Sequence, residues 1–125
     1  MDAVLYVVDL ARMVAFYRDG LRLAELSRHD GGAELRCGAC TLHLVTVPES
    51  VAAEIVITDP PVRREETPIK LIVPVENLAE ARRRAEEHGG VVDGPDHEWV
   101  WADSWRVDAV DPEGNVVQLA APRQH

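Results

Sequence analysis

The sequence predicts an α+β fold in which one unit, a strand followed by a helix and three strands, occurs twice. The main observation is an internal repeat: Val7-Val8-Asp9-Leu10-Ala11 is matched 68 positions later by Val75-Glu76-Asn77-Leu78-Ala79. Each copy ends a run typical of a strand and starts a run typical of a helix. The length of 125 residues fits a single domain with a buried core. Paired units form a shared cleft, and we expect a functional site there.

The first unit begins with a β-branched and aromatic run at residues 3–8, which predicts a buried strand. Asp9 is a suitable N-cap for a helix whose apolar residues recur at spacings of three and four up to residue 21. Three extended runs follow at residues 21–28, 33–37 and 40–47, separated by glycine-containing turns. The last turn lies within Cys37-Gly38-Ala39-Cys40, and we interpret its cysteines as thiols beside a hairpin turn rather than as a zinc or redox site.

A linker is predicted at residues 49–67, because prolines and a run of charged residues interrupt the pattern there. Its residues 51–57 are compatible with a short strand or a turn. The second unit starts at residue 68 with a strand at 69–75, and Asn77 is the expected N-cap of a helix that Gly89 ends. The remaining strands are expected at residues 91–92, 98–101, 104–111 and 115–121. A sharp turn at Asp111-Pro112-Glu113-Gly114-Asn115 separates the last two.

The composition excludes several classes of partner. The net charge is -9, with 22 acidic and 13 basic residues, which argues against a protein that binds nucleic acid or an anionic membrane. No segment approaches the roughly 20 apolar residues that span a bilayer, and the N-terminus has no secretion signal. We therefore expect a cytoplasmic protein with no nucleic acid and no membrane partner, whose ligands are small molecules or other proteins.

Two motifs identify a family resemblance. Val-x-Asp-Leu leads into Phe16-Tyr17-Arg18-Asp19-Gly20-Leu21, and a Trp105-Arg106 strand continues into Asp111-Pro112-Glu113-Gly114-Asn115-Val116-Val117-Gln118-Leu119. With the repeated unit, these motifs resemble the vicinal oxygen chelate superfamily, which includes glyoxalase I, fosfomycin-resistance enzymes, extradiol dioxygenases and bleomycin-resistance proteins. The resemblance covers essentially the whole chain. It implies two βαβββ modules that form a curved mixed β-sheet cup with helices on the outside, often within a homodimer.

On this basis residues 1–125 are one domain, with module one at 1–48, the linker at 49–67 and module two at 68–122. The same resemblance implies that metal ligands stand at the start of each unit's first strand and on its last strand. In this sequence those positions hold Asp2, His43, Lys70 and Gln118.

The residues at these positions depart from the family pattern. A protonated lysine such as Lys70 offers no lone pair to a metal, and Gln118 is a neutral donor where the family commonly has Glu. We therefore expect no metal cofactor; the alternative is a divalent metal ion held by Asp2, His43 and Gln118 with waters. Lys70 would otherwise pair with Asp2 or with another carboxylate, or anchor a ligand anion if it is unpaired.

Tryptophan is concentrated in one short stretch. Three of only six aromatic residues, Trp99, Trp101 and Trp105, lie within seven positions. Trp105 matches a position where the family often has Trp, whereas Trp99 and Trp101 stand among polar residues, as the aromatic walls of a pocket or an interface would. Strand alternation places mostly apolar residues beside the four positions named above. The candidate ligand-binding residues are Tyr6, His43, Lys70, Trp99, Trp101, Trp105 and Gln118.

Three functions of different classes remain. The leading prediction is metal-independent binding of a small organic ligand, such as the sequestration of an antibiotic or an aromatic metabolite, by a homodimer. The alternative is a metal-dependent lyase, isomerase or dioxygenase that uses Asp2, His43 and Gln118. The third is an interaction or regulatory module in which the charges of Asp2 and Lys70 close the cup. The sequence contains no nucleophile elbow and no phosphate-binding glycine loop, so it assigns no catalytic residue.

Overall fold

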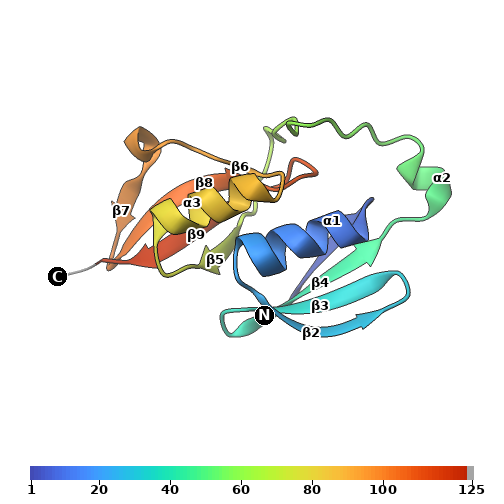
Figure 1. Cartoon of the computed structure of the whole chain (residues 1–125), viewed down its shortest axis with the longest axis horizontal. Helices are drawn as coiled ribbons and strands as arrows, with labels where there is room; N and C mark the ends of the chain where they lie inside the picture. The colour runs from blue at the N-terminus through green and yellow to red at the C-terminus, as the bar shows by residue number, and fades with distance from the viewer. Residues whose placement is uncertain (124–125) are drawn as a thin grey trace.

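The computed structural model describes residues 1–123 and contains two β-sheets side by side, with the two longer helices on the same side of both sheets (Figure 1). Sheet A has the strand order β1-β4-β3-β2, and sheet B has the order β5-β9-β8-β6, with β7 also paired to β8. In each sheet the first strand of the unit runs parallel to its last strand. These features confirm the α+β class and the repeated unit that the sequence predicts.

The first unit follows the predicted order with one change in its helix. Its elements are β1 (Ala3–Val7), α1 (Leu10–Ala15), the π-helical turn η1 (Phe16–Gly20), β2 (Ala24–His29), β3 (Gly32–Cys37) and β4 (Cys40–Thr46). Asp9 caps α1 as expected, because its carboxylate accepts a hydrogen bond from the Arg12 amide at 3.1 Å. The helix does not continue regularly to residue 21 but changes to a π-helical turn at residue 16.

The linker and the second unit differ more from the prediction. Their elements are α2 (Glu49–Ala52), β5 (Leu71–Pro74), α3 (Leu78–Glu87), β6 (Val91–Val92), the 3₁₀ turn η2 (Pro95–His97), β7 (Trp99–Trp101), β8 (Ser104–Val110) and β9 (Val116–Pro122). The predicted strand or turn at 51–57 is a single helical turn at residues 49–52, and no strand forms between residues 47 and 70. Since β6 and β7 both pair with β8, they share one strand position that η2 interrupts.

The core lies between the helices and one face of each sheet. Its largest fully buried side chains come from α1, η1 and the central strands: Tyr17, Phe16, Met13, Leu35, Leu42, Leu44, Val107 and Leu119. Each such side chain contributes roughly 1.5–3 kcal/mol through burial. We call the opposite face of both sheets the open face, because its apolar side chains remain exposed: Val4 by 55%, Tyr6 by 66% and Ile72 by 50%. Strand alternation therefore separates a packed face from an open one.

The two units are joined by buried polar contacts as well as by the linker. The Tyr17 hydroxyl donates to the carboxylate of Asp111 at 2.7 Å, and both residues are fully buried. In the same turn, the Glu113 carboxylate accepts hydrogen bonds from the amides of Val8 and Asp9, both at 2.8 Å. The turn between β8 and β9 therefore contacts the first helical segment both at its start and at η1.

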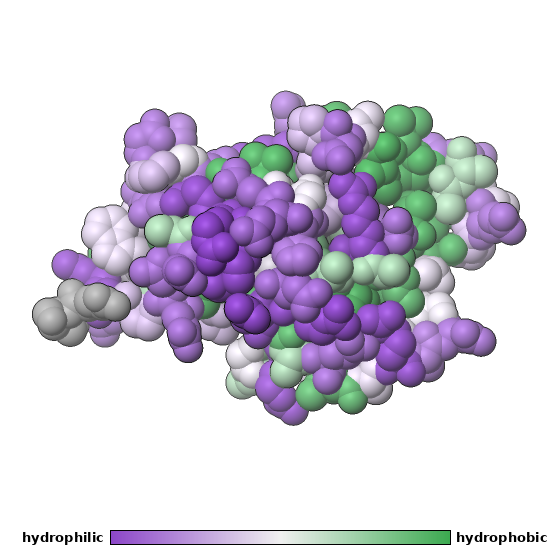
Figure 2. Space-filling model, in the orientation of Figure 1, coloured by the Kyte–Doolittle hydropathy of each residue, from purple (hydrophilic) through white to green (hydrophobic). Residues whose placement is uncertain are grey.

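The helix side of the molecule is mostly hydrophilic, and hydrophobic residues gather near α2 and the adjoining linker (Figure 2). Among residues 1–123, none of the helices has the length and the apolar character needed to span a membrane.

Candidate functional site

The open face of sheet B carries the two tryptophans that the sequence predicts to face a pocket or an interface. In the strand pairing, Trp99 on β7 lies opposite Arg106 on β8, and Trp101 lies opposite Ser104. Their exposed fractions are 36% for Trp99 and 64% for Trp101. Because residues two apart on a strand share a face, both indoles lie on the same side as the Arg106 guanidinium.

The Arg106 guanidinium is fixed by neutral side chains. Its Nε donates to the hydroxyl oxygen of Ser104 at 3.0 Å, and its Nη1 donates to Oε1 of Gln118 at 2.7 Å. Gln118 lies between Asp108 of β8 and Ile72 of β5 in the strand pairing. The predicted residue Gln118 is therefore on the open face, where it orients an arginine.

Lys70 pairs with a carboxylate, but not with Asp2. Its Nζ lies 2.8 Å from Oδ2 of Asp108, and the same oxygen accepts a hydrogen bond from Nη2 of Arg63 at 3.1 Å. Arg63 also donates to Asp93 at 2.9 Å, so two cations and two carboxylates form a network. The suggested pair with Asp2 is wrong, whereas the second option, another carboxylate, is confirmed. The charge of Lys70 is neutralised within its own sheet.

This network predicts unequal effects of mutation. Lys70→Met is expected to lower the free energy of unfolding by less than about 1 kcal/mol, because Arg63 still balances Asp108 and the lysine side chain is 33% exposed. Asp108→Ala is expected to cost more, about 2 kcal/mol, because it removes the largely buried carboxylate that both Lys70 and Arg63 contact. Urea unfolding of both variants measures the difference. A larger loss for Lys70→Met would contradict this assignment.

The open face of sheet A carries an acidic cluster that includes the predicted residue His43. Its Nδ1 lies 3.5 Å from Oε2 of Glu34, and its Nε2 lies 3.9 Å from Oδ2 of Asp2. Glu34 also accepts hydrogen bonds from Ser27 and His29, which lower the pKa of its carboxyl group. The same contact with Glu34 raises the pKa of His29. The open face of sheet A therefore carries the carboxylates of Asp2 and Glu34 and the guanidinium of Arg36, and that of sheet B carries the guanidinium of Arg106 beside the balanced network around Asp108.

The residues of the alternative metal set belong to different sheets, with His43 on β4 and Gln118 on β9. Asp2 and His43 lie together on sheet A, but Oε1 of Gln118 on sheet B already accepts from Arg106. Within residues 1–123, no group of three or more His, Cys, Asp or Glu side chains has an arrangement that could hold a metal ion. The fourth ligand position of the family holds Lys70, whose protonated ammonium group has no lone pair to give to a metal. The donor chemistry here fits a divalent ion poorly.

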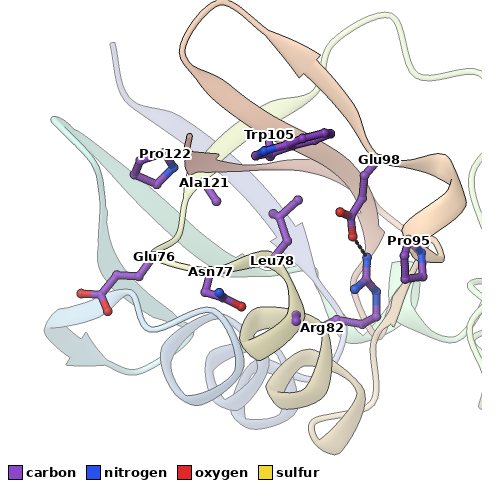
Figure 3. Close-up of a pocket in the computed structure, with 10 residues that line it drawn as sticks. Glu76, Asn77, Leu78, Arg82, Pro95, Glu98, Trp105, Ala121 and Pro122 are labelled. Atoms are coloured by element: carbon purple, nitrogen blue, oxygen red, sulfur yellow. Dashed lines mark hydrogen bonds and ion pairs between the residues drawn. The ribbon is translucent and has the colours of Figure 1, made fainter. Parts of the chain in front are cut away.

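Trp105 faces away from the other two tryptophans. It lies opposite Val100 in the strand pairing and so points to the helix side of sheet B. There it lines a cavity of about 410 Å³ with Leu78 of α3 and with the ion pair of Arg82 and Glu98 (Figure 3). The structure thus separates Trp105 from the open face.

Sequence reasoning missed three of the polar residues on the open face: Glu34, Arg63 and Arg106. Arg106 carried a usable signal, because it alternates with the apolar residues Trp105 and Val107 of β8. Arg63 had no such signal, since it lies in the linker and reaches Asp93 and Asp108 only through tertiary folding.

The repeated unit, the two mixed sheets and the open face define the class of protein: a member of the vicinal oxygen chelate superfamily. A family model described as a glyoxalase-like domain matches residues 2–120. The chain therefore belongs to the glyoxalase-like domain family. A comparison with curated proteins gave no significant match.

Solved structures share this fold at low sequence identity. A glyoxalase/bleomycin resistance protein/dioxygenase family enzyme from Burkholderia phytofirmans is 15% identical, with a TM-score of 0.69 over 97% of this chain and 96% of that chain. A glyoxalase/bleomycin resistance protein from Albidiferax ferrireducens is 15% identical, with a TM-score of 0.67 over 96% and 95%. A lactoylglutathione lyase from Agrobacterium tumefaciens is 25% identical, with a TM-score of 0.58 over 97% and 91%. The similarity supports the fold and leaves the ligand open.

Proposed function

We propose that the protein binds a small organic ligand on its open face without a metal ion. The observation that carries this proposal is the pair of exposed indoles, Trp99 and Trp101, on the same face as Arg106 and Gln118. Exposed tryptophans at neighbouring positions on one face offer a large apolar surface that a planar ligand covers by stacking. Tyr6 and His43 lie on the open face of sheet A, where Tyr6 pairs with Val45 and His43 pairs with Val4.

The absence of a metal from the proposed mechanism rests on the side chains present. Lys70 is engaged with Asp108, and Gln118 is engaged with Arg106, so half of the family's ligand positions serve ion pairing and hydrogen bonding. Binding of this kind needs only orientation: Gln118 and Ser104 hold the guanidinium in place, and the indoles provide the stacking surface.

The biological form that we propose is the sequestration of an aromatic antibiotic or metabolite by a cytoplasmic homodimer. Exposed apolar side chains at Val4 and Ile72, on the first strand of each sheet, support dimerisation because a second copy would cover them. Cys37 and Cys40 are both free although they pair across one hairpin, which fits a reducing compartment.

Ligand screening tests the stacking surface. Trp101→Ala is expected to weaken binding about threefold to tenfold, because a stacked aromatic pair contributes about 0.5–1.5 kcal/mol. A panel of aromatic antibiotics and metabolites, followed by indole N–H chemical shifts and by calorimetry, identifies ligands and measures affinity. Trp105→Phe is the matched control, since Trp105 lies on the opposite, helix-covered side of sheet B. Equal losses in the two variants would place the ligand elsewhere, and burial of both open-face indoles in a dimer would contradict ligand stacking.

Metal analysis separates this proposal from the enzymatic alternative. Protein purified without chelator is expected to contain no stoichiometric divalent ion. A bound ion that His43→Ala removes would reject metal-independent binding and favour a lyase, isomerase or dioxygenase of the same superfamily.

A further inference from the structure

Arg106 is unusual among the arginines of this chain. Five arginines are partly rather than fully exposed: Arg12, Arg18, Arg82, Arg84 and Arg106. Four of them form ion pairs with Asp or Glu side chains. Within residues 1–123, Arg106 has no carboxylate partner, and only the neutral groups of Ser104 and Gln118 accept its hydrogen bonds. Desolvating a guanidinium without a counter-charge costs free energy, so this position is suited to an anion supplied from outside.

The neighbours of Arg106 define the shape of that anion. Trp99 lies directly opposite on β7, and the small side chain of Ala120 lies opposite on β9. Two donor nitrogens of the guanidinium are engaged, and Nη2 makes no hydrogen bond to any described residue. Because Trp99 is the β7 neighbour of Arg106, its indole is available to the organic part of a ligand whose negative group lies next to Nη2. The arrangement favours a planar aromatic body attached to an acidic group.

The surrounding charges limit the anion to a single negative charge. The cations of Lys70 and Arg63 are already balanced by Asp108 and Asp93, which leaves one uncompensated positive charge on this part of the open face. The protein as a whole has a net charge of -9, which also disfavours highly charged anions.

We propose that the ligand class is a planar aromatic monocarboxylate, with its carboxylate on Arg106 and its ring on Trp99 and Trp101. This inference rests on the proposed function and specifies the chemistry of the same site. Gln118 and Ser104 act as positioning residues, because they hold the guanidinium in a fixed orientation toward the ligand. An arginine is suited to this role because its planar fork matches the two oxygens of a carboxylate.

The test compares ligands that differ only in charge. Naphthalene carboxylate and naphthalene carboxamide have nearly the same shape, and one-ring and three-ring acid and amide pairs extend the range of sizes. By calorimetry at neutral pH, the acid is expected to bind roughly tenfold to a hundredfold more tightly than its amide, the range that a hydrogen bond to a charged group provides. Arg106→Gln is expected to remove this preference, because it weakens binding of the acid far more than binding of the amide.

The controls separate a specific contact from general charge effects. Arg36→Gln removes the same charge from an exposed arginine of sheet A and is expected to leave the preference for the acid intact. Amide chemical shifts check that both variants keep the fold. If acid and amide bind the wild-type protein equally, the inference about Arg106 is overturned while ligand stacking stands. If neither the acid nor the amide of any pair binds, both the inference about Arg106 and the proposal of ligand stacking are overturned. Loss of the preference in Arg36→Gln as well would also reject a specific role for Arg106.

Discussion

Asp111→Ala is expected to lower the free energy of unfolding by about 3 kcal/mol, one of the two largest effects that we predict for a single substitution. The Asp111 carboxylate is fully buried and accepts hydrogen bonds from the Tyr17 hydroxyl at 2.7 Å and from the amides of Glu113 and Asn115 at 2.9 and 3.0 Å. Burial raises the pKa of Asp111, so the carboxylate itself is costly to bury. Alanine removes that cost but takes the acceptor from four donors, namely the Tyr17 hydroxyl, the Glu113 amide, and the backbone and side-chain amides of Asn115, and the second effect is larger.

Urea unfolding of Asp111→Ala and Tyr17→Phe measures this difference. Tyr17→Phe is expected to cost about 1 kcal/mol, because Oδ2 of Asp111 still accepts a hydrogen bond from the Asn115 side chain. Equal losses in the two variants would mean that the turn between β8 and β9 does not depend on its aspartate, contrary to our assignment.

The same pair predicts how stability depends on alkaline pH. Burial raises the pKa of Tyr17 well above its usual value, and the charge of Asp111 raises it further. The folded protein therefore keeps the Tyr17 proton where the unfolded chain loses it. The stability that this difference provides is complete below about pH 10 and is lost as the pH rises toward the folded-state pKa. Tyr17→Phe should therefore lose less stability than wild type above about pH 10, and identical pH profiles would contradict this linkage.

Gly90→Ala is expected to lower the free energy of unfolding by about 3 kcal/mol, at the upper end of the usual cost of overpacking. A Cβ atom at Gly90 would lie 2.2 Å from the Phe16 ring and 2.8 Å from the carbonyl oxygen of Val110. Phe16 is fully buried and Val110 presents backbone, so neither neighbour moves at low cost. Gly90 thus provides the close approach between η1 of the first unit and the second unit.

Gly94→Ala is the matched control for this substitution. Its added Cβ atom would meet the carboxylate end of Asp96 at 2.8 Å, and that exposed side chain can turn away. The backbone of Gly94 has a φ of -66°, which alanine adopts readily. A loss below about 1 kcal/mol is therefore expected in thermal or urea unfolding. If the two variants were equally stable, the contact between Phe16 and Gly90 would not limit the packing of the units.

Local rules predicted much of this fold from the sequence. The caps at Asp9 and Asn77, the strand alternation and the turn at residues 111–115 all depend on neighbours within a few positions. The change to a π-helical turn at Phe16 was not predictable in this way. Phe16 and Tyr17 are positioned by contacts with Gly90 and Asp111, which lie far along the chain. The spacing of apolar residues in the sequence contains no information about such distant contacts.

The candidate site was predictable only in part for a related reason. Strand alternation placed Trp99 and Trp101 on one face, but the short turn at Ala102 and Asp103 reverses the chain so that Trp105 pairs with Val100 and points the other way. The sequence could have predicted this orientation, because a two-residue turn puts Trp105 on the face opposite to that of Trp99 and Trp101. The network around Asp108 could not be predicted in this way, since Lys70 and Arg63 reach it from the linker side through tertiary folding.

The opposite charges of the two sheets give the open face a polarity. On the half formed by sheet A, the carboxylates of Asp2 and Glu34 outnumber the single guanidinium of Arg36, whereas Arg106 leaves a positive charge on the half formed by sheet B. A dipolar ligand approaching this surface would experience a torque before it makes contact, with its negative end turned toward sheet B. The two units thus repeat the same backbone arrangement but differ in the charge of their side chains. A dipolar ligand would therefore be oriented before it binds.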